Sequence, residues 1–366
     1  MILGYYVVIL IASAICCGVF YIIKRKYYSA VYTLIFLLAF ISQFCYVLMC
    51  FAQNAREALI IYKFCYIGGC YLPLAGLFLI FSICKIDLPK WAKFIMILFA
   101  SCVYACALSA GYSPLFYKDY DITVKNGVTV LVKEYGPLHY LFLAEIGIFL
   151  SMTIFALVFG WIKKNDVSRR NLVIAAFLQV FSIFAYLLGR LITKDIEWMA
   201  LADLIDEIGF LIIMDRIGLY RVDDLVSSSI VKEGKSGYIS LDFNKRYLSA
   251  TTVAKRFLPE LAHNSADKVI ADDKLRESFN KWIDEYKNEN LSIRHIYRRG
   301  DFIYLIHVGD LYDGINKRGY LIVITDDTEH QLHREGIERY NQNLNRELIA
   351  KTNLIRELRE EKRESE

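Results

Sequence analysis

The sequence predicts a multidomain membrane protein with an all-α bundle of seven transmembrane helices, then an α+β domain, then a C-terminal coiled-coil helix. Three observations support this fold class. The 366 residues are 56% hydrophobic yet 22% charged, and nearly all of the long apolar runs lie before residue 218. The residues that follow have the mixed composition of a soluble domain. The last segment is dense in charge and nearly free of glycine and proline.

Seven apolar segments predict the transmembrane bundle of residues 1–217. A spanning helix needs about 20 apolar residues to cross about 30 Å of hydrocarbon. The first run is too long for the apolar part of a signal peptide and follows no basic segment, so we expect a first span and no cleaved leader. The seventh is the most polar, because three acids lie in its first half. The segments are 2–23, 29–51, 58–83, 94–110, 138–161, 171–190 and 198–217.

Basic residues in the short loops predict the orientation. Cytoplasmic loops carry an excess of lysine and arginine. Alternate loops of this chain are basic, which predicts that the N-terminus lies outside and the C-terminus in the cytoplasm. Opposite ends require an odd number of spans, which supports the seventh. The basic residues are Lys24, Arg25, Lys26, Lys85, Lys90, Lys93, Lys163, Lys164, Arg169, Arg170, Arg216 and Arg221.

The longest outer loop, 111–137, has the pattern of a β-hairpin. Two β-prone runs flank Asn126-Gly127, a dipeptide that supplies the positive φ angles of a tight hairpin turn. The hairpin is either a lid that packs the outer mouth of the bundle or a lid over a ligand pocket, and the sequence leaves both open.

Polar residues inside the spans are the candidate ligand site. Ionisable groups within a membrane are costly, so they usually face the bundle interior and mark either a functional site or a structural pair. A small polar or cationic ligand would fit acids near the outer mouth, whereas pairing of these acids with Arg190 or Lys63 is the structural alternative. We expect no metal, and we expect the nine cysteines to pack as small apolar side chains. The candidate ligand-binding residues are Gln43, Glu145, Gln179, Arg190, Asp203, Asp206 and Glu207.

Two motifs carry a family resemblance over about residues 1–225. The third span contains Tyr66-Ile-Gly-Gly-Cys-Tyr-Leu-Pro73, and the outer loop ends in Glu134-Tyr-Gly-Pro-Leu138. Both resemble the N-terminal seven-helix sensor region of bacterial histidine kinases and diguanylate cyclases. Other seven-helix proteins fit less well. Segment 198–217 has no lysine for a retinal Schiff base, and the chain has no internal repeat of the kind typical of transporters.

After an expected linker, 218–234, residues 235–329 resemble a PAS domain. Two strands, several helices and three further strands predict an α+β fold with one sheet, with a helix over 251–261. The ending Val323-Ile-Thr-Asp-Asp-Thr-Glu329 is similar to the exit motif of PAS sensors. The resemblance implies that Asp326 and Thr328 tie the last strand to the next helix and relay the signal. We expect no cofactor, because residues 218–366 contain no cysteine for a flavin adduct and His263, His295 and His307 are more typical of structural histidines than of haem ligands.

The tail, 330–366, has the spacing of a coiled coil. Residues that are mostly apolar recur along a helical segment at alternating steps of four and three residues. This spacing favours a parallel dimer over a single solvated helix. The seam positions are Ile337, Asn341, Leu344, Leu348, Lys351, Ile355 and Leu358.

No catalytic or nucleotide-binding motif occurs, so we do not expect an enzyme. The sequence predicts a membrane-bound receptor, the input and relay half of a histidine kinase-type two-component or cyclic-di-GMP signalling protein. Its expected partners are a second copy, an unidentified small-molecule signal, the lipid bilayer and a downstream kinase, cyclase or response regulator. With a net charge of +4 and no basic block, nucleic acid is not expected. The alternative is a membrane-anchored scaffold whose PAS domain binds a cytosolic ligand or partner.

Overall fold

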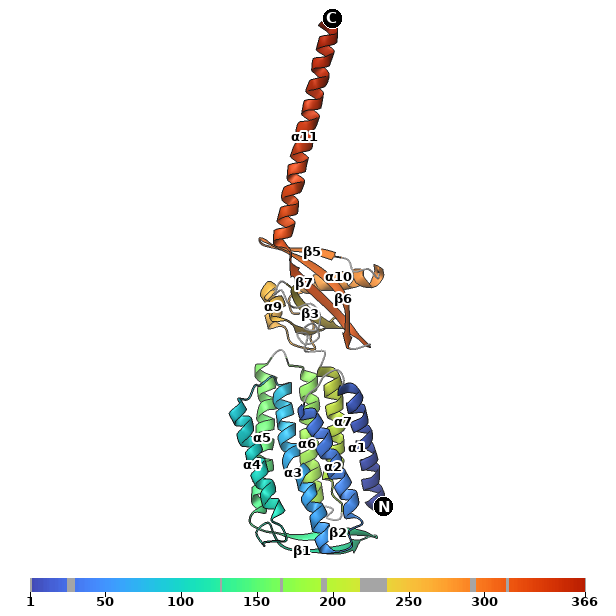
Figure 1. The fold of residues 1–366 in the computed structure, drawn as a ribbon, viewed down its shortest axis with the longest axis vertical. Coiled ribbons are helices and arrows are strands. Elements are labelled where there is room, and N and C mark those ends of the chain that lie inside the picture. The colour runs from blue at the N-terminus through green and yellow to red at the C-terminus, as the bar shows by residue number, and fades with distance from the viewer. Residues whose placement is uncertain are drawn as a thin grey trace.

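The structure is a computed structural model that describes residues 2–24, 30–125, 127–164, 167–191, 196–217, 236–289, 294–313 and 316–365. The expected linker 218–234 and Asn126 of the hairpin turn lie outside the described residues. The remaining segments form a helical bundle, an α+β domain at one end of it, and a long projecting helix (Figure 1).

The structure describes helices α1 to α7 in the bundle, and they pack side by side (Figure 1). Six of them, α1 to α6, are long and apolar enough to cross a membrane. The seventh, α7, carries five charged residues and packs against α1, α2 and α6. The helices are α1 (Ile2–Lys24), α2 (Ala30–Met49), α3 (Ala55–Ile83), α4 (Lys90–Leu108), α5 (His139–Lys163), α6 (Arg169–Leu191) and α7 (Met199–Ile217).

The two sequence motifs of the bundle correspond to close backbone contacts. A Cβ at Gly68 of α3 would lie 1.8 Å from the Ser42 Oγ on α2, so only glycine lets these two helices approach as they do. Such small-residue contacts are typical of helix packing in membranes. In the second motif, a Cβ at Gly136 would lie 2.3 Å from the carbonyl oxygen of Leu115. Gly136 thereby closes the base of the outer loop.

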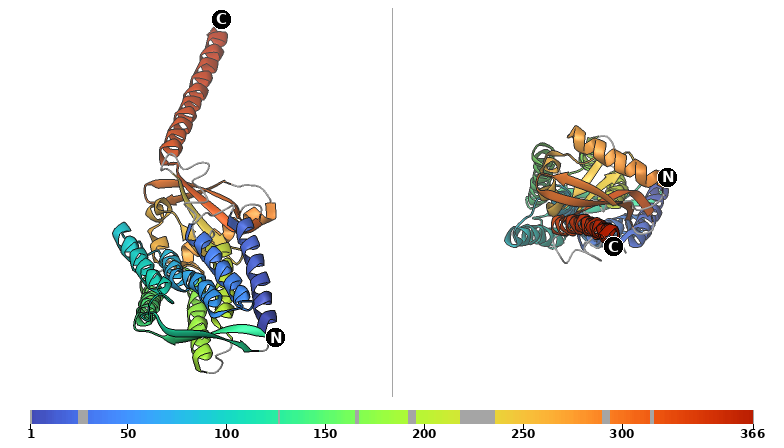
Figure 2. Two further views of the ribbon diagram at one scale, coloured as in Figure 1. Left: turned by 60° about the horizontal axis from the view of Figure 1, so that its bottom comes forward. Right: turned by 90° about the horizontal axis from the view of Figure 1, so that it is seen from above.

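The outer loop forms the expected antiparallel hairpin of β1 (Tyr117–Lys125) and β2 (Val128–Tyr135). It lies across the end of the bundle opposite the α+β domain (Figures 1 and 2). Thr129 fastens it to the end of α2, because its N–H donates to the Cys50 carbonyl at 3.3 Å and its hydroxyl donates to the Ala52 carbonyl at 2.7 Å. The hairpin therefore packs on the mouth of the bundle.

The α+β domain contains a five-stranded antiparallel sheet in the order β4-β3-β7-β6-β5. Helix α9 (Thr252–Phe257), the 3-10 helix η3 (Pro259–His263) and α10 (Asp273–Glu289) pack on the inner face of this sheet. That face is filled by apolar side chains, including Ile306, Ile322 and Phe279. The strands are β3 (Ser236–Asp242), β4 (Tyr247–Ala250), β5 (Arg294–Arg299), β6 (Phe302–Asp313) and β7 (Asn316–Asp326).

One expected helix is broken. The predicted helix over 251–261 ends at Phe257, and a 3-10 helix follows from Pro259. Proline disfavours helical backbone in the residue before it, and Leu258 has φ −126° and ψ 82°. The final helix, α11 (Thr328–Ser365), is a single run of 38 residues that projects away from the sheet (Figure 1).

Candidate functional site

The end of the bundle that the hairpin covers, which is called the outer end after the predicted orientation, holds a cluster of charged and aromatic side chains. Lys133 of β2 lies with its Nζ 3.5 Å from the centre of the Tyr62 ring. Burial lowers the pKa of Lys133 to about 8, while the nearby Glu197 acts in the opposite direction. Burial likewise raises the pKa of Glu197, and Lys133 opposes that shift. The hairpin thus brings a cation to an acid that precedes α7.

Two tyrosines of α1 hold the segment that carries Glu197. The Tyr5 hydroxyl donates to the Glu197 carbonyl at 3.3 Å, and the Glu197 N–H donates to the Tyr6 hydroxyl at 2.9 Å. Tyr6 stacks on Tyr46 of α2 with ring centres 5.7 Å apart. The outer cluster is therefore Tyr5, Tyr6, Tyr46, Tyr62, Lys133 and Glu197.

The predicted acids of α7 continue inward from this cluster but contact different neighbours. The Ser182 hydroxyl of α6 donates to Asp206 at 3.1 Å, and the Ser13 hydroxyl of α1 donates to Glu207 at 2.9 Å. Asp203 is half-buried and lies in the field of Glu197, Asp206 and Glu207. The three acids therefore share a helix but do not point at one partner.

Gln43 and Gln179 come from two other helices of the bundle. Gln43 is fully buried on α2, and its Nε2 donates to the Ala200 carbonyl of α7 at 2.8 Å. This contact places the amide of Gln43 one turn before Asp203. Gln179 is half-buried on α6.

Glu145 lies apart from α7, and Arg190 is described only in part. Glu145 of α5 is fully buried beside the Cys70 thiol of α3. Arg190 belongs to α6, but its side chain lies outside the described residues. Of the predicted set, the structure thus brings Gln43, Asp203 and Glu207 to one region.

The sequence did not single out Lys133 or Glu197. Both lie in segments between spans, where charged residues are common. Only the path of the hairpin across the bundle brings them together, and no spacing in the sequence indicates that path.

The other end of the bundle contacts the α+β domain through ion pairs. Arg318 of β7 donates to Asp215 of α7 at 2.6 Å. A second contact centres on Asp267, which accepts from the Ser168 hydroxyl at 2.5 Å and lies 3.5 Å from the Arg216 guanidinium. Ser168 also accepts from the Asn171 N–H at 3.3 Å and so caps α6. One end of α6 and one end of α7 therefore both contact the α+β domain.

Asp326 and Thr328 lie where β7 enters α11. The Thr328 hydroxyl and the Asp326 carboxylate are 2.6 Å apart, and Thr328 also accepts from the Ile303 N–H at 2.9 Å. One side chain therefore joins the last strand, β6 and the first turn of α11.

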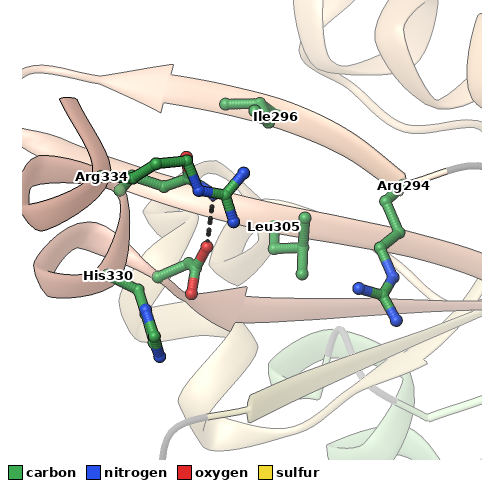
Figure 3. A pocket seen from close by; sticks show the side chains of 7 residues that line it. Arg294, Ile296, Leu305, His330 and Arg334 are labelled. Carbon is green, nitrogen blue, oxygen red and sulfur yellow. Dashed lines mark hydrogen bonds between the residues drawn. The ribbon is translucent and has the colours of Figure 1, made fainter. Parts of the chain in front are cut away.

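A groove opens beside the first turns of α11 on the outer face of the sheet (Figure 3). There Gln331 donates to Asp327 at 2.6 Å. Arg298 of β5 pairs with Glu335 at 2.5 Å and pins the second turn of the helix. The groove is lined by Arg294, Ile296, Leu305, Asp327, His330, Gln331 and Arg334.

The fold defines a multi-pass membrane protein with six apolar helices and a C-terminal α+β region that ends in a long helix. Residues 8–218 match the family described as the N-terminal 7TM region of histidine kinase, and the chain belongs to this family. It is therefore a signalling membrane protein with a sensor region typical of histidine kinases. A comparison with curated proteins found no match.

Proposed function

We propose that this chain is the input and relay half of a histidine kinase-type two-component or cyclic-di-GMP signalling protein. It senses an extracellular or membrane signal in a bundle of seven spans and passes the signal through a PAS domain to a coiled coil. One observation carries the proposal: β7 has the α7 contact near its start, at Arg318, and leads directly into α11 at its end.

The geometry of β7 suits a relay. Arg318 and Asp326 are eight residues apart, which corresponds to about 27 Å of extended strand. β7 is hydrogen-bonded to β3 on one side and to β6 on the other, so it cannot bend independently of these neighbouring strands. A shift of α7 is therefore transmitted to the root of α11, where Thr328 ties strand to helix. Two discrete arrangements of α7, β7 and the start of α11 would form the two states of the switch.

Loop charges support an orientation with the N-terminus outside. The loops between α3 and α4 and between α5 and α6 lie at the end of the bundle that faces the α+β domain (Figure 1). These loops and their helix ends carry Lys85, Lys90, Lys163, Lys164 and Arg169. Because cytoplasmic loops are rich in basic residues, the α+β domain is cytoplasmic and α7 is the seventh span of a bacterial plasma-membrane protein.

A second copy is the proposed partner of α11. The helix contacts its own domain at β6 and, through the Arg298–Glu335 pair, at β5, and Ile337, Leu344 and Leu348 are between 45 and 61% exposed. These residues follow the heptad spacing, so a parallel dimer would bury them. The dimeric helix would then act on a kinase, a cyclase or a response regulator.

Disulfide crosslinking in membranes tests the relay. In the Leu344→Cys variant, a dimer with α11 paired forms a crosslink between copies on mild oxidation, and the parent chain gives the background from its own cysteines. The proposal predicts that Arg318→Asp and Thr328→Val both change the crosslinking rate. Arg346→Gln on the exposed surface of α11 is the matched control and leaves the rate unchanged. Equal crosslinking rates in the Leu344→Cys chain and in its three derivatives, with Arg318→Asp, Thr328→Val or Arg346→Gln added, would favour the scaffold alternative.

A further inference from the structure

The seam between α1, α2 and α7 has hydrogen-bond acceptors without donors. Gln43 and Glu207 are fully buried, and the Gln43 Oε1 and the Glu207 Oε2 have no partner among the described residues. An unsatisfied polar atom inside a membrane costs several kcal/mol by general estimates. Both orphan atoms are oxygens, and a hydrogen-bond donor would satisfy each of them.

These two acceptors lie on either side of Asp203. Gln43 contacts α7 at Ala200, and Ser13 contacts α7 at Glu207. Ala200, Asp203 and Glu207 recur at the three- and four-residue spacing of one helix face, over about 10 Å of axis. The Gln43 amide, Asp203 and Glu207 therefore form one column of acceptors along α7.

Carboxyl groups gather along the column. Asp203 lies in the field of Asp206, Glu207 and Glu197, in that order of strength. Lys133, the cation of the outer cluster, acts on Glu197. A ligand with a positive charge and its own N–H donors would pair with these carboxyl groups and satisfy the orphan oxygens.

The surroundings favour an organic cation over a metal ion. The described residues contain no group of three or more His, Cys, Asp or Glu side chains placed to hold a metal. Tyrosine rings line the outer end of the column, where Tyr46 stacks on Tyr6 and lies in the field of Asp203. Aromatic faces attract organic cations, and the rings of Tyr5 and Tyr46 are only half-buried.

We propose that the seam between α1, α2 and α7 binds a primary organic ammonium, whose N–H groups donate to Gln43, Asp203 and Glu207. This inference rests on the proposed receptor function and specifies the class of its signal. Such a ligand bridges α7 to α1 and α2, and α7 is the helix whose far end contacts the soluble domain through Asp215.

The test measures thermal stabilisation of the full chain in lipid nanodiscs by three probes of similar shape. Phenethylammonium carries the proposed headgroup, 2-phenylethanol is neutral, and trimethyl(phenethyl)ammonium is charged but has no N–H. Stabilisation by phenethylammonium alone supports the proposal. Stabilisation by none of the probes, or equal stabilisation by all three, overturns it.

Variants locate the site. Asp203→Asn and Glu207→Gln each replace one carboxyl group that would pair with the ammonium, and either is expected to weaken phenethylammonium binding by about 10- to 100-fold. Glu134→Gln on β2 is the matched control. This exposed acid lies at the same end of the bundle but outside the column, so its substitution leaves binding unchanged. If neither α7 variant weakens binding, the proposed site is wrong. Failure here with a positive crosslinking result would reject the ligand class and leave the receptor function standing.

Discussion

Reversal of the charge at the Asp215–Arg318 contact weakens the docking of the α+β domain on the bundle. The two groups are 2.6 Å apart, and their side chains are 41 and 29% exposed, respectively. Exposed ion pairs contribute about 0.2–1 kcal/mol, and this partly buried pair belongs near the upper limit. Asp215→Arg loses the attraction and adds repulsion of similar size, so the predicted loss is about 1–2 kcal/mol.

Urea unfolding of the α+β domain within the full chain measures this loss. Docking to the bundle stabilises the folded domain by linkage. Trp282 is 8% exposed in its core and packs on His295, so its fluorescence reports unfolding once the other three tryptophans are replaced by phenylalanine. With a slope of about 1.5 kcal/mol/M, the midpoint falls by about 1 M.

The charge swap provides the decisive comparison. Asp215→Arg combined with Arg318→Asp restores an ion pair of opposite polarity, so the double variant recovers at least half of the lost midpoint. A double-mutant cycle then gives the coupling energy of the pair. The reasoning is refuted if both single variants unfold like the parent chain, or if the two losses simply add in the double variant.

Three further predictions concern packing, pH and the exit of β7. Gly68→Ala destabilises the bundle by about 1–3 kcal/mol through overpacking. In thermal unfolding, a second substitution, Ser42→Ala, recovers part of this loss, because it removes the oxygen that would lie 1.8 Å from the new Cβ. No recovery would mean that another contact causes the loss. The pKa of Lys133 falls from 10.5 to about 8 in the folded chain, so the unfolded state binds more protons between these values and stability rises with pH across them. Melting temperatures from pH 7.5 to 10 should show this rise in the parent chain and not in Lys133→Met, and parallel curves would contradict it. Thr328→Val removes the acceptor for the Ile303 N–H and costs about 1–2 kcal/mol of α+β domain stability, whereas unchanged urea midpoints would show that the tie is dispensable.

Much of the bundle was predictable because the membrane sets strict local rules. Hydrocarbon thickness fixes the length of an apolar helix, so the expected spans agree with α1 to α6 to within a few residues. The hairpin and the five-stranded sheet were predictable for a similar reason, since turn residues and alternating side chains are local signals. The α+β region had the expected order of elements, apart from the break at Pro259.

The candidate site was less predictable because its contacts are non-local. Three acids on α7 were visible in the sequence, but their partners Ser13 and Ser182 are on two other helices and are ordinary polar residues. The contact between Asp215 and Arg318 joins residues 103 positions apart. No local pattern specifies such a contact, because it depends on how the α+β domain sits on the end of the bundle.

The central claim is that the outer end of the bundle controls α11, and the Leu344→Cys crosslink tests it most directly. The informative perturbation is Asp203→Asn, because this residue lies about three turns before Asp215 on α7 and its substitution leaves the Asp215–Arg318 contact intact. The relay predicts that this variant changes the crosslinking rate of α11 in native membranes, while Glu134→Gln on the hairpin does not. If the Leu344→Cys chain crosslinks at the same rate with and without Asp203→Asn, while Arg318→Asp still alters that rate, the bundle anchors the protein but does not signal through α7.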